Sequence, residues 1–265
     1  MSDNARMHIE TVGQGPSLVL IHGWALHGGV FAPLIERLSG SHTLHLVDLP
    51  GHGRSRDTPT PLELDACAEA ILARTPEAIW CGWSLGGLFA LTAARKSPQV
   101  KALAMIAATP RFVRGPDWPH AVEVEVFTQF GEALRHDYRG TLERFLALDT
   151  IGSEHARAEL RTLKDTLYAR GEPAPEALQQ GLRLLENTDL RAQLALLDVP
   201  SLWISGRRDR LVPAAGMADA AALAPWSRHL DIPGGGHAPF LGHADSVAAS
   251  LADFAAAVAH LPRTH

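Results

Sequence analysis

Short apolar runs alternate with amphipathic stretches over the first 110 residues of the chain. Two segments, 62–74 and 85–95, carry apolar residues at helical spacing. They alternate with four short apolar runs that are typical of buried strands, at 17–22, 43–48, 78–82 and 101–107. Strands that alternate with helices predict a parallel sheet covered by helices on both faces, which is the α/β class of fold.

The pattern changes after residue 110, where the strand-like runs stop. Amphipathic stretches typical of helices replace them, at 122–134, 141–148 and 155–168. Two strand-like runs and a last helix follow near the end of the chain, at 200–205, 228–232 and 244–259. We therefore predict a core of residues 1–110 and 198–265, with residues 111–197 inserted as a helical lid.

The composition narrows the function classes. The chain has 265 residues with a net charge of -5, which argues against nucleic acid as a partner. Its two cysteines, Cys67 and Cys81, are too few for a disulfide framework and have no metal-binding spacing. The sequence starts without a signal-peptide pattern and has no uncharged apolar stretch of about 18 residues. We expect a cytoplasmic protein with no membrane segment.

A candidate nucleophile stands directly after the third apolar run. The sequence Gly82-Trp83-Ser84-Leu85-Gly86 fits the G-x-S-x-G pattern, with a predicted strand before it and a predicted helix after it. Glycines beside the serine allow the tight turn that lifts its hydroxyl above a sheet. Ser84 is therefore the predicted nucleophile, against the alternative of a serine in an ordinary glycine-rich turn.

A serine hydroxyl needs a base to take its proton and a carboxylate to orient that base. Among fourteen histidines, His237 lies in a glycine-rich loop directly after the last predicted strand, where it can reach the carboxyl edge of the sheet. Asp209 follows the preceding strand in the same way. Asp198 and Asp231 are rivals, but the first precedes its strand and the second lies within one. A salt-bridged surface carboxylate is the alternative interpretation of Asp209, because arginines flank it.

A tetrahedral intermediate also needs two N–H donors for its oxyanion. The backbone N–H of Leu85, directly after the serine, is the first candidate. The N–H of Trp24, in the His22-Gly23-Trp24 loop that follows the first buried strand, is the second. The alternative interpretation of this loop is a simple strand end.

Together these residues resemble the α/β-hydrolase superfamily, and the resemblance runs along the whole chain. It rests on His22-Gly23-Trp24, the segment 48–55, the Ser84 motif, Asp209 and His237. The resemblance implies a mostly parallel central sheet with helices on both faces and a helical lid inserted after the sixth strand. It also implies hydrolysis by a Ser-His-Asp triad with no metal or cofactor.

A narrower resemblance joins the chain to the pimeloyl-[acyl-carrier protein] methyl ester esterases of biotin synthesis. It rests on residues 44–51, 79–88 and 143–148, the last of which lie in the lid. It implies an acyl pocket beside Trp24, Ser84, Leu85 and His237, lined by Phe145, Leu146, Ala147, Leu148 and Asp149. It also implies a monomer that docks an acyl-carrier protein through lid arginines, namely Arg139, Arg144, Arg157 and Arg161. Gly140 departs from the family pattern, which has an arginine there.

The function predicted from these features is a serine carboxylesterase that acts on the methyl ester of a pimeloyl-acyl-carrier protein. A general short-chain carboxylesterase, a thioesterase, a perhydrolase or a carbon–carbon bond hydrolase on the same fold remains open. A non-enzymatic ligand receptor is disfavoured by the complete triad. The docking role of the arginines is weaker, because residues 111–170 hold nine basic and ten acidic side chains, so the lid as a whole is not basic.

Overall fold

The computed structural model describes residues 7–260 and contains one seven-stranded sheet. The strands are β1 (Ile9–Gly13), β2 (Ser17–Ile21), β3 (Thr43–Val47), β4 (Ala78–Trp83), β5 (Val100–Ile106), β6 (Ser201–Gly206) and β7 (Ser227–Ile232). Their order is β1-β3-β2-β4-β5-β6-β7, and only β1 runs antiparallel to its neighbour. The predicted α/β fold with a mostly parallel sheet is confirmed.

Burial explains which strands the apolar runs predicted. The central strand β4 is buried along its whole length, so its sequence is apolar throughout. β1 was not predicted, because it is a half-buried edge strand that mixes polar and apolar residues. One detail of the expectation was wrong: the helical insertion follows β5, the fifth strand of the described residues, instead of a sixth.

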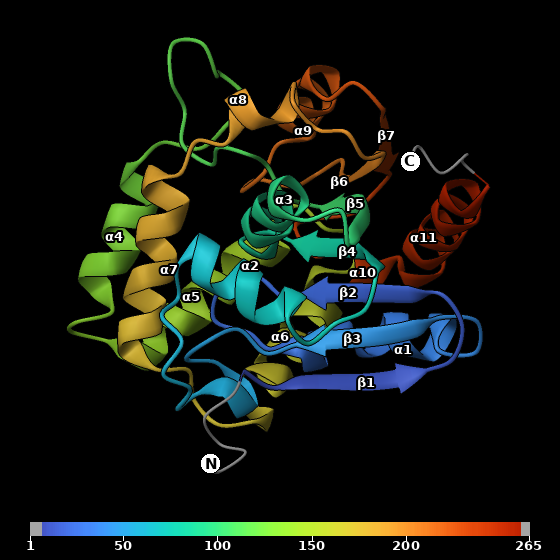
Figure 1. The fold of residues 1–265 in the computed structure, drawn as a ribbon. Coiled ribbons are helices and arrows are strands. Elements are labelled where there is room, and N and C mark those ends of the chain that lie inside the picture. Colours follow the sequence, from blue (N-terminus) through green and yellow to red (C-terminus); the bar gives the residue numbers. More distant parts are fainter. Residues whose placement is uncertain (1–6, 261–265) are drawn as a thin grey trace.

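Helices cover both faces of the sheet. They are α1 (Ala32–Leu38), α2 (Leu64–Leu72), α3 (Gly86–Lys96), α9 (Ala214–Leu223), α10 (Pro239–Gly242) and α11 (Ala244–Ala259), with two short 3-10 helices, η2 (Gly28–Phe31) and η3 (Gly53–Ser55). α1 packs against α11 on one face, and α2 packs against α3 on the other (Figure 1). None of the helices in residues 7–260 is long and apolar enough to cross a membrane.

The segment between β5 and β6 is helical, as its amphipathic pattern predicted. It contains α4 (Glu125–Ala133), α5 (Tyr138–Thr150), α6 (Ala156–Ala169), α7 (Pro175–Asn187) and α8 (Arg191–Leu194). The arrowheads of β2 and β4 point toward these helices, and that of β1 points away (Figure 1). The insertion therefore lies at the carboxyl edge of the parallel strands, where α/β proteins build their sites.

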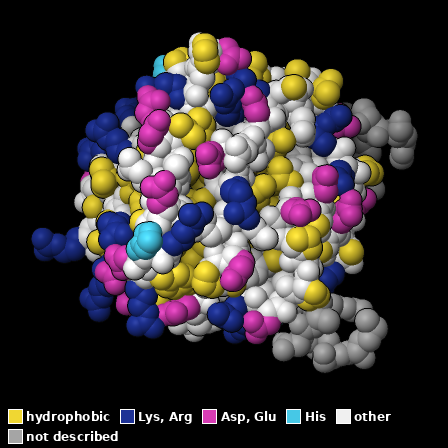
Figure 2. Space-filling view, turned by 90° about the vertical axis from the view of Figure 1, so that its left-hand side faces the viewer, with side chains coloured by type: hydrophobic (Ala, Val, Ile, Leu, Met, Phe, Trp, Pro, Cys, Tyr) yellow, Lys and Arg dark blue, Asp and Glu magenta, His cyan; other side chains and the backbone are white. Residues whose placement is uncertain are grey.

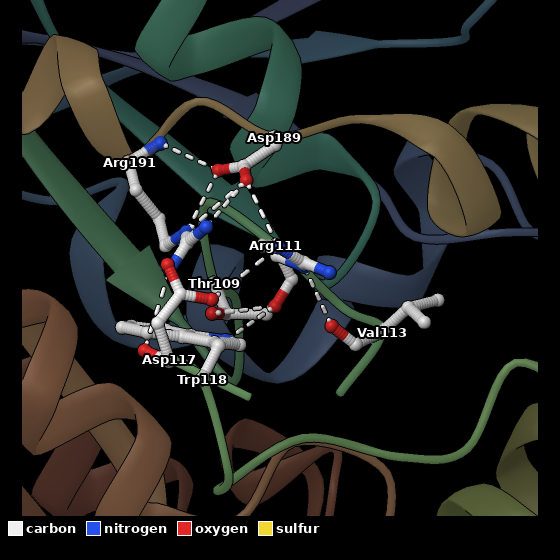
Figure 3. Close-up of polar contacts among 7 residues, drawn as sticks. All are labelled: Thr109, Arg111, Val113, Asp117, Trp118, Asp189 and Arg191. Carbon is white, nitrogen blue, oxygen red and sulfur yellow. Dashed lines mark hydrogen bonds and ion pairs between the residues drawn. The ribbon is translucent and has the colours of Figure 1, made fainter. Parts of the chain in front are cut away.

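A polar network, which we call the neck, joins the two ends of the insertion. Asp189 accepts hydrogen bonds from the guanidinium groups of both Arg111 and Arg191, and Arg191 also binds Asp117 (Figure 3). The Arg191 guanidinium lies over the Trp118 ring, 5.4 Å from its centroid. The backbone of residue 190 donates to that of residue 110 over 2.9 Å. The two ends of the insertion are thus bonded to each other where they join the core.

We predict that Asp189→Ala loosens the neck, because it removes the acceptor shared by both arginines. The free energy of unfolding should fall by about 1 kcal/mol, a modest value because these charges are partly exposed and screened by water. Urea unfolding at low and high salt measures the loss, which should shrink at high salt. Asp165→Ala, which removes an exposed carboxylate 3.9 Å from Arg161, is the control. Equal losses in the two variants would contradict the prediction.

Candidate active site

Ser84 occupies a strained turn between β4 and α3. Its φ of +52° is in the left-handed region, which is costly for a residue with a side chain. Two glycines let the turn close: a Cβ built on Gly82 would lie 2.5 Å from the Cα of Gly87, and one on Gly86 would lie 2.1 Å from the carbonyl oxygen of Ile21. The turn therefore requires glycine on both sides of the serine, as the sequence motif indicated.

The structure brings Ser84, His237 and Asp209 into one hydrogen-bonded chain. The Oγ atom of Ser84 lies 2.8 Å from Nε2 of His237, and Nδ1 of the same ring lies 2.8 Å from Oδ2 of Asp209. All three side chains are buried. This order of contacts suits a serine that passes its proton to an imidazole held by a carboxylate.

The carboxylate of Asp209 is fixed by the backbone that follows it. Its Oδ1 atom accepts hydrogen bonds from the N–H groups of Leu211 and Val212, at 2.8 and 2.9 Å. Its Oδ2 atom is thereby directed at the histidine. The rival carboxylates lie elsewhere: Asp198 is exposed, and Asp231 in β7 accepts a hydrogen bond from Ser205.

The backbone N–H and the backbone carbonyl of His237 both make hydrogen bonds that hold its loop. The His237 N–H donates to the carbonyl oxygen of Asp149 over 3.1 Å, and its carbonyl oxygen accepts from Nε1 of Trp83 over 2.8 Å. Burial alone would lower the pKa of His237, but the charge and hydrogen bond of Asp209 and the charge of Asp149 together raise it above its ordinary value. The imidazolium form is thus stabilised where it would form during proton transfer.

The loop that carries Trp24 is anchored by a buried neutral histidine. Nε2 of His22 accepts from the N–H of Leu49 over 2.9 Å, so Nδ1 carries the proton and donates to the Gly23 carbonyl over 2.7 Å. Burial lowers the pKa of His22 to about 3, which keeps the ring neutral. A Cβ built on Gly23 would lie 3.1 Å from Cβ of Ser84, so this loop passes directly beside the serine.

The two candidate oxyanion donors are unpaired in the described chain. Within residues 7–260, no backbone or side-chain acceptor bonds the N–H of Trp24 or that of Leu85. Buried N–H groups without acceptors are rare in proteins, because each costs free energy. Two such groups flanking Ser84 are therefore available to a ligand atom.

A cluster of aromatic rings closes the site from the insertion side. The ring of Phe145, on α5, lies 4.5 Å from that of Trp24 and 5.2 Å from that of Phe130 between ring centroids. The Trp24 indole N–H donates to the carbonyl oxygen of Leu178 in α7 over 2.9 Å. Both α5 and α7 therefore contact the loop beside the serine, and the buried Ser84 becomes accessible only when side chains here move.

The five residues predicted to line the acyl pocket lie on different sides of α5. Helical periodicity directs Phe145, Leu148 and Asp149 to one side of α5, and Leu146 and Ala147 to others. Phe145, Leu146 and Asp149 are buried, whereas Ala147 and Leu148 are half-buried. Phe145 contacts Trp24, and the Asp149 carbonyl oxygen accepts from the N–H of His237.

From the sequence, Asp149 was predicted only as a pocket residue. Its buried, unpartnered carboxyl and the resulting rise of its pKa were not anticipated. Neither carboxylate oxygen has a hydrogen-bond partner within the described chain, and both are buried. Burial raises the pKa of Asp149 to about 7, with a smaller contribution from Asp209. An aspartate on the buried side of an amphipathic helix, one turn after Phe145, was the available signal. The charge of Asp149 and the protonation of His237 are therefore coupled, because each favours the other's charged form.

Three of the four lid arginines are engaged by acidic neighbours. Arg139 pairs with Glu172, Arg144 with Asp137 and Arg161 with Asp165, all at exposed positions. Arg157 is exposed and makes no ion pair within residues 7–260. Figure 2, which faces α4 and α7, shows basic and acidic side chains interspersed, in agreement with the mixed charge of the sequence.

Gly140 lies where a side chain would displace the carboxylate of Asp137. Its N–H donates to the capping carboxylate of Asp137, and a Cβ there would lie 2.2 Å from that carboxylate. The departure from the family's arginine is therefore coupled to the Asp137 cap of α5.

Comparisons with known proteins identify the family to which the chain belongs. A family model described as the alpha/beta hydrolase fold matches residues 16–244. The chain is 69% identical over 252 residues to a protein of Xanthomonas oryzae pv. oryzae and 70% identical to one of Xanthomonas campestris pv. campestris. Both are named pimeloyl-[acyl-carrier protein] methyl ester esterase, and each match covers 95% of this chain and all of the relative. An esterase from Exiguobacterium antarcticum shares the fold, with a TM-score of 0.84, 22% identity and 94% of each chain covered.

We predict that Asp149→Asn lowers the pKa of His237, because it removes a negative charge that favours the imidazolium. NMR titration of the His237 ring measures this directly, with the exposed-site variant Asp165→Asn as the control. An unchanged or higher pKa would contradict the coupling of the two groups.

The same substitution gives a second readout. Because burial raises the Asp149 pKa from 3.8 to about 7, its ionisation opposes folding increasingly as the pH rises between these values. The melting temperature of Asp149→Asn relative to the wild type should therefore increase over this interval.

Proposed function

The chain belongs to the alpha/beta hydrolase fold family, and we propose that it is a serine esterase that hydrolyses the methyl ester of a pimeloyl-acyl-carrier protein. The hydrogen-bonded chain of Ser84, His237 and Asp209 is the observation that carries the catalytic part. The substrate follows the names of relatives that are 69–70% identical over 95% of the chain, insertion included.

In the proposed reaction, Ser84 Oγ attacks the ester carbonyl carbon while Nε2 of His237 takes its proton. The negative charge that develops on the carbonyl oxygen is bound by the N–H groups of Trp24 and Leu85. The carbon–oxygen bond to the methoxy group then breaks, and His237 returns the proton so that methanol leaves. Water attacks the acyl-serine in the same way and frees the carboxylate of the product.

The buried cluster of aromatic rings supports an acyl substrate. We place the acyl chain of the substrate between the loop of Trp24 and the side of α5 that carries Phe145. The other predicted pocket residues of α5 surround this acyl chain. Each methylene buried there contributes roughly 0.8 kcal/mol. Because the rings of Trp24 and Phe145 are in contact in this structure, the acyl chain can enter only when α5 or α7 shifts relative to Trp24.

The proposal includes docking of the carrier protein on the exposed arginines of α5 and α6. Arg157 is the best placed for it, because Arg139, Arg144 and Arg161 already pair with carboxylates. We further propose that the enzyme acts as a cytoplasmic monomer with no cofactor and with neither membrane nor nucleic acid as a partner. The net charge of -5 supports the last point.

The proposal predicts rapid methanol release from the methyl ester of a pimeloyl-acyl-carrier protein by the purified protein. Ser84→Ala should lower kcat by a factor on the order of 10^4 to 10^6, because the acyl-serine cannot form. Asp209→Asn should lose about 10^4, because the imidazole adopts the wrong tautomer. If Ser84→Ala retains a tenth of the activity, the catalytic assignment is wrong. If only p-nitrophenyl esters turn over, the protein is a general short-chain esterase.

A second prediction concerns docking. Arg157→Glu should raise KM for the carrier-bound substrate roughly tenfold, because it places a negative charge opposite the acidic carrier. Turnover of a p-nitrophenyl ester should not change. Arg228→Glu, which reverses an exposed arginine of β7 outside the insertion, is the matched control. Equal effects of the two substitutions on the carrier-bound substrate would locate docking elsewhere.

A further inference from the structure

A cluster of two histidines and a glutamate joins the insertion to the core beside the loop that carries His237. Glu154 and His155 directly precede α6 in the insertion, and His243 links α10 to α11 in the core. One ligand atom from each of the three lies within 4.8 Å of the other two. Nothing in the proposed ester hydrolysis uses these residues.

The two imidazoles converge on a single carboxylate oxygen. Nε2 of His155 lies 3.7 Å from Oε1 of Glu154, and Nε2 of His243 lies 3.6 Å from the same atom. Hydrogen bonds of this kind measure about 2.7–3.2 Å, so neither contact is one. Ligand atoms about 2.0–2.2 Å from a tetrahedral zinc ion lie roughly 3.4 Å from one another. These two separations therefore suit ligands of one ion better than hydrogen bonds, and the remaining pair of ligand atoms lies within 4.8 Å.

The His243 ring gives an independent indication. Its Nε2 atom is buried, yet it has no hydrogen-bond partner within the described chain. Buried ring nitrogens normally have a partner, because an unpaired one loses its hydration without compensation. A metal ion at the centre of the cluster would supply that partner, and the exposed side chains of Glu154 and His155 leave a path for it.

Local packing holds the ligands in place. Ser153 Oγ donates to Oε1 of Glu159 over 2.7 Å and accepts from the N–H of His155 over 3.1 Å. A Cβ built on Gly242 would lie 2.8 Å from Cδ2 of His155 and 2.4 Å from Oε1 of Glu159, so only glycine lets α10 approach α6 this closely. Neighbours that restrain ligand side chains are a regular feature of metal sites.

We propose that Glu154, His155 and His243 form a binding site for a divalent transition-metal ion, with Zn²⁺ as the best match to a donor set of two imidazoles and one carboxylate. Zn²⁺ favours such ligands in tetrahedral geometry, with a water molecule in the fourth position. No metal was expected from the sequence, because His243 is far from Glu154 and His155 along the chain and meets them only in the fold.

The site has a structural consequence for the base of the proposed esterase. The N–H of Glu154 donates to the carbonyl oxygen of Gly234 over 3.0 Å, and Gly234 begins the loop that carries His237. Gly234 has a φ of +78°, and a Cβ there would meet the Glu154 carboxylate at 2.3 Å. A metal bound by Glu154 and His243 would therefore fasten the insertion to both sides of the His237 loop.

Calorimetric titration of chelator-treated protein with Zn²⁺ tests the proposal. We expect one equivalent to bind, and His155→Ala and His243→Gln each to weaken the affinity at least tenfold, as losses at metal sites typically do. Cobalt bound in place of zinc should give the visible absorption of tetrahedral Co²⁺, and both variants should lose it. Zn²⁺ should raise the melting temperature of the wild type but not of His155→Ala or His243→Gln, because it binds the folded site.

The chain offers a matched control. His120 and Asp219 form another exposed histidine–carboxylate pair, at 2.6 Å, on the other side of the insertion. His120→Ala should retain the binding, the spectrum and the shift in melting temperature. Wild-type binding that neither His155→Ala nor His243→Gln weakens, or no binding at all, would overturn the proposal. Because these readouts need no ester, they stand independently of the proposed esterase activity.

Discussion

The site depends on one local constraint, the left-handed backbone of Ser84 between β4 and α3. A residue held at such a φ costs about 1–3 kcal/mol, so the surrounding fold must keep it there. The buried strand β4 fixes one side of the turn, and the contact of Gly86 with the end of β2 fixes the other. This approach also brings the Gly23 loop beside the serine. The proposed nucleophile and the proposed oxyanion donors are thus positioned by the same packing.

A second constraint is electrostatic. The site buries two carboxylates, Asp209 and Asp149, around one imidazole. Asp209 is satisfied by two backbone N–H groups and by His237, whereas Asp149 has no partner in the described chain. Burial of this unpartnered carboxyl raises the pKa of Asp149 to about 7. The unpaired carboxyl of Asp149 on α5 therefore links its own protonation to that of the His237 imidazole.

The sequence predicted the parts of the molecule that obey local rules. Apolar runs predicted the buried strands, and the glycines around Ser84 predicted the turn, because each depends on neighbouring residues in the chain. The half-buried edge strand β1 was not predicted, since its pattern mixes polar and apolar positions. The raised pKa of Asp149 and the convergence of His155 and His243 were also not predicted, because both arise from contacts between the insertion and the core. Asp209 and His237 were predicted because their loops follow strands that end at one edge.

The central claim is that the Ser84 hydroxyl, activated by His237, is the nucleophile of this protein. Mass spectrometry after treatment with a fluorophosphonate tests it directly, because such reagents modify serines whose proton is removed by a neighbouring base. The account predicts one adduct per chain, located on the peptide that contains Ser84 and absent from Ser84→Ala. Modification of another residue, or no modification of the folded wild-type protein, would contradict it.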